Sequence, residues 1–418
     1  MEALLTCAMG LDIHRDLIVA CLIRGELNGT PEIEIRSFST LAPSMRELRD
    51  WVLETECRNV AMESTGIYWQ PIYETLEDCF GGEINLLVVN ARHVKNAPGR
   101  KTDIRDSQWI AMLLRAGLLS GSFIPAKEIR ELRQYTRYRK AIVRDVTSQK
   151  NRIDKFLQSS GFRLSAFISD IFGASGRAII RHLCEHGEID RDALDKCLKT
   201  KTRHKIDDIL VSVNGTLSKH QGECLHMMFA HMETLEKHRS AVESAIAETV
   251  QRHTEALTLL ISIPGIDVTA ASSIIAEIGT DMSSFPDSQH FSSWAGLSPG
   301  NNKSAGRSKN AHITKGNPYL KSMLCEVAWV VAGKRNTYLA SWYWRIKQQK
   351  GAKRAVIALA RKLLVMIYAM LKNKTPYNDD SYEQRRKQSE QKRSSRMIHE
   401  LTKLGYQVTA VAPNVEFT

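Results

Sequence analysis

The sequence lacks several features that would assign it to a specialised class. No stretch approaches the ~18 consecutive apolar residues of a membrane span. The N-terminus does not combine a basic segment, an apolar run and a small-residue cleavage site, so we expect no signal peptide. None of the 8 cysteines forms a CxxC pair, which argues against a zinc ribbon or a dense disulfide framework. We therefore expect a cytoplasmic protein without a membrane partner.

Acidic residues are also in short supply relative to basic ones. The 418 residues include 58 Lys and Arg against 46 Asp and Glu, which gives a net charge of +12. Such an excess favours polyanionic partners such as nucleic acid, although a basic soluble protein would show the same balance. At about 150 residues per domain, the chain holds roughly two to four domains.

The first 125 residues carry the pattern of a mixed α/β domain. Apolar and alternating segments predict strands at 4–13, 16–23, 32–38, 58–63 and 84–90, and amphipathic segments predict helices at 44–56, 68–80 and 103–118. The first three strands can form an antiparallel meander, whereas the later alternation of strands and helices implies parallel crossovers. This is the element order of the RNase H-like fold.

Four acids occupy distinctive positions in this pattern. Asp12 ends the first strand, Glu63 ends the fourth, and Asp103 and Asp106 open the last helix on one face. In the expected fold the first and fourth strands are neighbours and the last helix packs beside them, so the four carboxylates would meet. Such a cluster needs cations, and ligands that are all oxygen select Mg²⁺ or Mn²⁺. A single acid at a strand end is usually a solvated residue or a cap, and Asp103 could merely cap its helix, so the prediction rests on the four acids together.

The middle of the chain predicts a long, strongly basic helix at 128–157 and a second long helix at 223–250, each with a heptad-like apolar row. The rows are Leu132, Tyr135, Ile142, Val146, Ile153 and Phe156 in the first helix, and Leu225, Met228, Met232, Leu235, Val242 and Ile246 in the second. One interpretation is a coiled-coil pair that dimerises and presents Arg133, Arg137 and Arg139 to nucleic acid. The other is two core helices with solvated charges, and the sequence leaves both open.

Two motifs follow in the last third of the chain. Residues 257–279 predict two apolar helices around a Pro264-Gly265 turn, which is the pattern of a helix–hairpin–helix that can hold a phosphate. Residues 296–321 are rich in Gly, Ser, Asn and Lys, which is typical of an exposed functional loop. Ser304 lies there among cations, where its alkoxide would be stabilised. The chemistry of the loop alone favours the alternative, a flexible basic loop in which the serine has no role. Lys303, Arg307 and Lys315 are the candidate nucleic-acid contacts of this loop.

Together these segments resemble the DEDD transposases of the Piv/MooV type, the insertion sequence 110 family, over roughly residues 8–375. The resemblance rests on GLDIHRD, AMESTGIYW, KTDIRD, IPGIDVTAA, WAGLSPGNNKSAG, KGNPYLK and GAKRAVIALARKLL, in the order of the family. It implies a RuvC-like domain at 1–125, a coiled-coil region at 126–252 and a helical C-terminal transposase domain at 253–377. The composition of 378–418 predicts a charged tail, which lies outside the resemblance. It places the four metal-binding acids of the family on Asp12, Glu63, Asp103 and Asp106.

The resemblance also implies chemistry and partners. The catalytic serine of the family falls on Ser304, which would form a phosphoserine link to DNA. The serine stands in the triplet Ser304-Ala305-Gly306, where the family often has paired serines or glycines, and Ser308 is a nearby competitor. Implied partners are donor and target DNA, a structured guide RNA called the bridge RNA, and further subunits in a dimer or tetramer, in the bacterial cytoplasm at the nucleoid.

Two other functions fit parts of the sequence. A RuvC-like junction-resolving endonuclease would need the four acids but no serine nucleophile, so Ser304 would be dispensable. A nucleic-acid-binding protein without catalysis would need only the hairpin and the coiled coil, and metal-dependent cleavage would exclude it.

Overall fold

The structure is a computed structural model, and it describes residues 2–64, 66–90, 106–299, 302–304, 307–310, 313, 316–334 and 337–408. For 302–304, 307–310, 380–386 and 389–390 the description is confined to the backbone. The chain divides into two compact units, Met1–Ile124 and Pro125–Thr418, and each is described by itself. Among the described residues no helix is long and apolar enough to cross a membrane.

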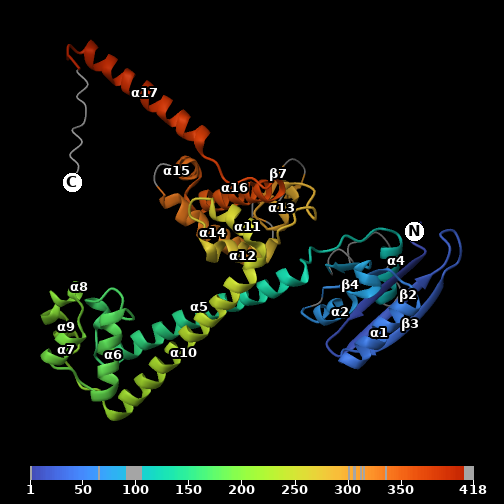
Figure 1. Ribbon diagram of the computed structural model, residues 1–418, viewed down its shortest axis with the longest axis horizontal. Coiled ribbons are helices and arrows are strands. Elements are labelled where there is room, and N and C mark those ends of the chain that lie inside the picture. The colour runs from blue at the N-terminus through green and yellow to red at the C-terminus, as the bar shows by residue number, and fades with distance from the viewer. Residues whose placement is uncertain are drawn as a thin grey trace. The chain divides into compact units, whose positions relative to one another are not determined.

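A mixed five-stranded sheet forms the centre of the first unit, in the order β3-β2-β1-β4-β5 (Figure 1). Its strands are β1 (Cys7–Ile13), β2 (Leu17–Arg24), β3 (Glu32–Ser39), β4 (Asn59–Glu63) and β5 (Asn85–Val89). β1, β2 and β3 form an antiparallel meander, whereas β4 runs parallel to both β1 and β5. Each strand expected from the sequence is present, and the predicted neighbours β1 and β4 are paired.

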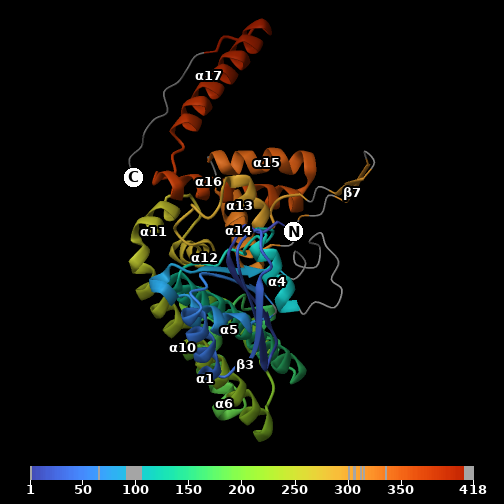
Figure 2. The same cartoon turned by 90° about the vertical axis from the view of Figure 1, so that its right-hand side faces the viewer.

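Helices cover both faces of this sheet, and Figure 2 shows α1 and α4 on opposite sides of the strands. On one face, α1 (Ala42–Glu54) and α2 (Trp69–Leu76) bury Trp51 and Ile72 against Met9 and Leu11. On the other face, α4 (Asp106–Arg115) buries Trp109 and Ile110 against the small side chains of the strands. The odd and even positions of β1 therefore contact different helices, because side chains alternate along a strand.

The second unit begins with two long helices that pack against each other, α5 (Lys127–Ser159) and α10 (Lys219–Val250). The pair is formed within one chain. Leu132, Ile142, Val146 and Ile153 of the predicted row are buried, but Tyr135 is 41% exposed, so its place in that row was wrong. Phe229, which the second row omitted, is buried.

Short helices between α5 and α10 close one end of this pair. They are α6 (Ala174–His186), α7 (Arg191–Cys197), α8 (Thr200–Arg203) and α9 (Ile206–Ser212), with the 3₁₀ turn η2 (Leu164–Ala166). Their apolar residues share a core with Leu157 of α5 and Leu225 of α10.

The remaining helices form the C-terminal part of the second unit. They are α11 (Thr254–Ile261), α12 (Val268–Ile278), α13 (Ser288–Trp294), α14 (Pro318–Gly333), α15 (Tyr338–Lys350), α16 (Ala352–Asn373) and α17 (Asp380–Lys403). α16 packs on α13, α14 and α15, and α12 packs on α5. Two features were not predicted: the tail after 378 contains the helix α17, and the loop at 296–321 contains a hairpin of β6 (Asn302–Ser304) and β7 (Arg307–Asn310).

Candidate active site and its charged surroundings

The acids Asp12 and Glu63 lie at the carboxyl ends of two neighbouring parallel strands. Leu11 of β1 pairs with Met62 of β4, so Asp12 and Glu63 occupy the next position on each strand. Both side chains are half-buried. The Nε2 atom of His14 lies 3.3 Å from an Asp12 carboxylate oxygen. Asp12 and Glu63 therefore meet at one end of the sheet.

Both acids point to the face that α4 covers. Ala61, two residues before Glu63, packs in one cluster with Trp109 of α4. Gly10, two residues before Asp12, faces α4 so closely that an added Cβ would lie 2.2 Å from the backbone oxygen of Ser107. Residues two apart on a strand share a face, so Asp12 and Glu63 are directed to this same side.

Helix α4 starts at Asp106, directly before the residue that contacts Gly10. The other end of α4 is held by Arg115, which donates hydrogen bonds to the carbonyl oxygens of Leu5 (3.0 Å) and Glu26 (2.8 Å). The lack of a side chain at Gly10 thus lets the helix approach β1 beside Asp12. Asp103 lies outside the described residues.

Carboxylate oxygens dominate the donor set at this end of the sheet, which suits Mg²⁺ or Mn²⁺ better than the softer transition metals. Across the described part of the chain, no group of three or more His, Cys, Asp or Glu side chains stands close enough to hold a metal ion. Asp103 lies outside the described residues, so the four-acid set remains a prediction.

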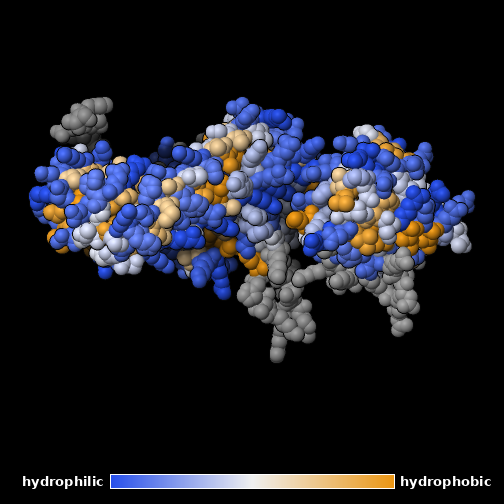
Figure 3. All heavy atoms as spheres, turned by 90° about the horizontal axis from the view of Figure 1, so that it is seen from below, coloured by the Kyte–Doolittle hydropathy of each residue, from blue (hydrophilic) through white to orange (hydrophobic). Residues whose placement is uncertain are grey.

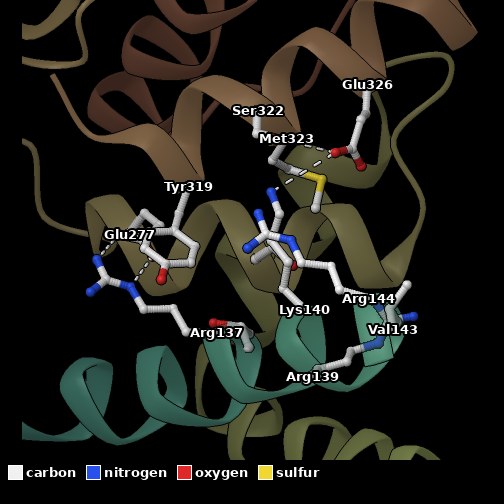
Figure 4. Close-up of a pocket in the computed structure, with 12 residues that line it drawn as sticks. Arg137, Arg139, Lys140, Val143, Arg144, Glu277, Tyr319, Ser322, Met323 and Glu326 are labelled. Carbon is white, nitrogen blue, oxygen red and sulfur yellow. Dashed lines mark hydrogen bonds and ion pairs between the residues drawn. The ribbon is translucent and has the colours of Figure 1, made fainter. Parts of the chain in front are cut away.

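The three arginines predicted to contact nucleic acid are engaged inside the second unit. Arg137 donates two hydrogen bonds of 2.8 Å to the carboxylate of Glu277, and its guanidinium lies 4.3 Å from the ring centre of Tyr319 (Figure 4). Arg133 donates to the carbonyl oxygens of Ala276 (2.9 Å) and Glu277 (2.8 Å) at the end of α12. Arg139 donates to Glu243 of α10 at 2.8 Å. Their contact with nucleic acid is untested, and all three hold helices together.

Glu277 is the centre of this network. Its side chain is 3% exposed and also accepts a hydrogen bond of 2.6 Å from the Nδ2 atom of Asn317. Burial lowers the pKa of Arg133 to about 10, although the Glu277 carboxylate opposes this shift. The hydrogen bond and charge of Glu277 outweigh burial at Arg137, whose pKa is raised. A buried carboxylate thus balances two partly buried guanidinium groups.

The same network fixes the foot of the loop that carries Ser304. Asn317 caps α14 by accepting hydrogen bonds from the amides of Tyr319 (3.0 Å) and Leu320 (3.2 Å). Gly316 lies against the backbone of Gly296, where an added Cβ would be 2.2 Å from the Gly296 nitrogen. The two ends of the loop therefore meet at a neck that Asn317 ties to Glu277.

Ser304 ends β6, and its backbone pairs with Arg307 of β7. Lys303 pairs with Ser308, so the two candidate serines lie on opposite strands of one hairpin. Lys315 lies outside the described residues. The predicted roles of Lys303, Ser304 and Arg307 stay predictions.

The turn between α11 and α12 has the two-helix form expected from the sequence, but its surroundings differ from an open phosphate site. Gly265 has a φ of +100°, and an added Cβ would lie 3.0 Å from a methyl group of Val331. The carboxylate of Asp267 already accepts a hydrogen bond of 2.7 Å from the amide of Ala270 in the first turn of α12. An acid therefore caps the helix end that was expected to hold a phosphate.

Sequence reasoning missed Glu277 and Asn317. Each left a signal: Glu277 is the single acid in the apolar helix VTAASSIIAEI, and Asn317 precedes a proline, as a helix cap often does. A lone acid in an apolar helix is expected to have a cationic partner elsewhere in the fold.

Comparison with known proteins supports the family inferred from the motifs. Residues 9–161 match the family model of the IS110-type DEDD domain, described as "Transposase". Residues 257–345 match the model described as "Transposase IS116/IS110/IS902 family". The first match contains all four predicted acids, and the second contains Ser304.

Individual relatives match over shorter segments. A "Probable family 20 transposase" of Pseudomonas aeruginosa is 25% identical over 183 residues, which are 43% of this chain and 54% of the relative. The "Pilin gene-inverting protein" of Moraxella bovis is 33% identical over 129 residues, 30% of this chain and 40% of the relative. An "Insertion element IS110 uncharacterized 43.6 kDa protein" of Streptomyces coelicolor is 29% identical over 150 residues, 35% of this chain and 36% of the relative.

The chain thus spans about a third to about half the length of these relatives. The two family models match separate parts of the chain in the order that the motifs predicted. The protein belongs to the IS110 family of DEDD transposases.

Proposed function

We propose that this protein is a transposase that cuts and rejoins DNA through a metal-dependent site of Asp12, Glu63, Asp103 and Asp106 and a serine nucleophile, Ser304. The observation that carries the proposal is the position of Asp12 and Glu63 on neighbouring strand ends of a 3-2-1-4-5 sheet, on the face covered by the helix that starts at Asp106. This arrangement supports a RuvC-like, RNase H-type assignment of the first unit.

In this proposal the four carboxylates hold one or two Mg²⁺ ions, which supply charge stabilisation at the transferring phosphate when bound. Asp12 and Glu63 provide oxygens from the rigid sheet, and Asp106 and Asp103 provide them from the start of the helix. Because carboxylates of like charge repel one another, the cation also relieves a local cost of folding.

Ser304 takes the covalent role. Its Oγ atom forms a bond to the phosphorus as the bond between phosphorus and the bridging oxygen of the strand breaks, and the leaving oxygen takes up the proton that the serine gives up. A strand hydroxyl then attacks the phosphoserine and restores the Oγ–H group. The ester conserves the energy of the broken bond, so rejoining needs no external energy source.

The acids and the serine belong to different compact units. The proposal therefore requires the acids and Ser304 to be brought together, either by folding or, as the family resemblance suggests, by assembly of subunits in a dimer or tetramer on donor and target DNA with a guide RNA. The basic excess of the chain supports a polyanionic partner. Figure 3 shows one face of the surface, on which hydrophilic residues prevail and apolar ones are scattered.

The test is to incubate the protein with DNA, Mg²⁺ and the guide RNA, and to look for a protein–DNA adduct that survives denaturation. Ser304→Ala should abolish the adduct, whereas Ser308→Ala should retain it. An adduct that persists in Ser304→Ala would refute the serine assignment. Cut ends without any adduct would favour the second candidate, a RuvC-like junction-resolving endonuclease that uses water, because such an enzyme needs only the acids.

A further inference from the structure

A basic pocket of about 350 Å³ opens between α5, α12 and α14 in the second unit (Figure 4). Four cations from successive turns of α5 line it: Arg137, Arg139, Lys140 and Arg144. Its walls also carry Tyr319 and Met323 of α14. Pockets of this size are common binding sites for small groups.

The four cations differ in how they are neutralised. Arg137 is paired with Glu277 and Arg139 with Glu243, both at 2.8 Å. Lys140 has only a loose partner, with its Nζ atom 3.9 Å from the carboxylate of Glu326. Arg144 forms no hydrogen bond or ion pair with any other described residue.

Figure 4 shows Lys140 and Arg144 extending from α5 toward α14. The two like charges are held on one helix at i and i+4, a spacing that is unfavourable without a counter-charge. Among the described residues, the one carboxylate paired with either cation is that of Glu326, whose side chain is 62% exposed. An anion of better fit can therefore displace it at little cost.

We propose that this pocket binds a backbone phosphate of a nucleic acid strand, with Lys140 and Arg144 as its ligands and Glu326 as the group that the phosphate displaces. The paired arginines Arg137 and Arg139 serve as the scaffold of the pocket. The nucleic acid as the source of the phosphate rests on the proposed function, since the pocket itself selects only the phosphodiester.

The pocket lies close to the neck of the loop that carries Ser304, which indicates its role. Tyr319 lies in the first turn of α14, two residues after Asn317, which ties down the neck of the loop with Ser304. A phosphate bound to Lys140 and Arg144 beside Tyr319 places its strand near the neck of the loop that carries the β6–β7 hairpin. The pocket thus positions a strand for the hairpin rather than taking part in the bond exchange.

The first experiment measures binding of a labelled single-stranded oligothymidylate by fluorescence anisotropy at several salt concentrations, using the full chain. K140Q/R144Q should weaken binding about tenfold, and should reduce the slope of log Kd against log salt by about 0.7, the value for one lost phosphate contact on a single strand. The matched control is R152Q/K155Q, which removes two charges from exposed positions of the same helix outside the pocket. An equal loss in both variants would overturn the proposal.

A variant that should bind more tightly than the wild type controls for loss of binding through misfolding. E326Q removes the competing carboxylate and should tighten binding about threefold, a change that misfolding does not produce. Unchanged or weaker binding by a folded E326Q would contradict the displacement of Glu326. An arm with oligouridylate in place of oligothymidylate shows whether the site prefers RNA or DNA, and either preference supports a phosphodiester ligand.

A last measurement separates the pocket from the proposed function. Inorganic pyrophosphate should raise the melting temperature of the wild type and of R152Q/K155Q, but not of K140Q/R144Q. If pyrophosphate binds as expected while neither oligonucleotide does, the proposed function fails and the anion site stands. If oligonucleotides bind the wild type and K140Q/R144Q equally, the pocket proposal fails and the proposed function stands.

Discussion

The acids of the first unit and the arginines of α5 are charged sets with opposite arrangements. Asp12 and Glu63 have the same sign and are brought together at adjacent strand ends. Arg133 and Arg137 are instead matched by a buried acid, Glu277. Carboxylates of like charge that lie together can bind a cation, because the cation neutralises their repulsion. Arginines that are already paired with a buried acid stabilise the fold instead and are not free to bind a ligand. The difference separates residues expected to control activity from residues expected to control stability.

Asp12→Asn should give the largest difference between an effect on activity and an effect on stability. We expect it to lower the rate of DNA strand cleavage about a thousandfold, because one metal ligand is lost where charge develops on the phosphate. The free energy of unfolding should stay the same or rise, since the repulsion among the carboxylates is relieved. Chemical denaturation and a cleavage assay measure the two quantities.

Asp16→Asn is the matched control, because its side chain is 82% exposed in the turn after β1. It should leave both cleavage and stability unchanged. A fully active Asp12→Asn variant would remove Asp12 from the site.

At Glu277 we expect a substitution to lower stability, in contrast to Asp12, where it lowers activity. Glu277→Ala leaves the guanidinium groups of Arg133 and Arg137 partly buried without their carboxylate, which costs about 3–5 kcal/mol of unfolding free energy. Glu243→Ala removes the partner of Arg139, but that carboxylate is 38% exposed, so the cost should stay below about 1 kcal/mol. Urea denaturation of the two variants gives the comparison, and equal losses would show that Glu277 is not the centre of the network.

Close packing in the first unit offers a third test. Gly10→Ala places a Cβ against the backbone of Ser107 and Ala111, so α4 must move away from β1. We expect a loss of about 1–3 kcal/mol, the usual cost of overpacking, together with slower cleavage because Asp106 moves with α4. Gly333→Ala is a control of opposite sign, since Gly333 lies in α14 with open space around it and alanine favours a helix by about 0.5–1 kcal/mol. Thermal unfolding that ranks the two alike would contradict the tight contact at Gly10.

These two regions also differ in how far their sequence predicted them. The strands of the first unit carry apolar runs, and parallel crossovers bring the ends of β1 and β4 together, so the positions of Asp12 and Glu63 follow from topology. The partners of Arg133 and Arg137 do not, because a basic helix face can be solvated or packed with the same local pattern. Glu277 lies 140 residues from Arg137, and only the packing of α12 on α5 joins them.

The loop with Ser304 shows a second limit of pattern reading. Its composition predicted exposure and function, but it lacks the alternation of apolar residues that signals a strand. The β6–β7 hairpin is held by backbone pairing, and its neck is held by Gly296 and Gly316. This close backbone approach joins two glycines at opposite ends of the loop, so a local sequence pattern does not predict it.

The smallest expected effect compares one thiol in each unit. Cys7 and Cys184 are both half-buried, but their pKa values shift in opposite directions. A hydrogen bond with Cys57, opposed by burial and aided by Arg24, lowers the pKa of Cys7, whereas burial together with Glu185 raises the pKa of Cys184 to about 11. Because the thiolate is the reactive form, iodoacetamide at pH 8 should label Cys7 at least about tenfold faster than Cys184.

The labelling rates of the two thiols should also depend on pH in different ways. The labelling rate of Cys184 should rise about tenfold per pH unit up to about pH 11, while that of Cys7 should level off below pH 9. Cys57→Ala removes the hydrogen-bond partner of Cys7, so it should raise the pKa of Cys7 and slow its labelling without changing that of Cys184. Mass spectrometry of the labelled peptides measures all three rates. Equal labelling of Cys7 and Cys184 at pH 8 would mean that the Cys7–Cys57 contact between β1 and the segment before β4 does not form. The same pairing of β1 with β4 sets the strand register that brings Asp12 beside Glu63, so this result would contradict that register as well.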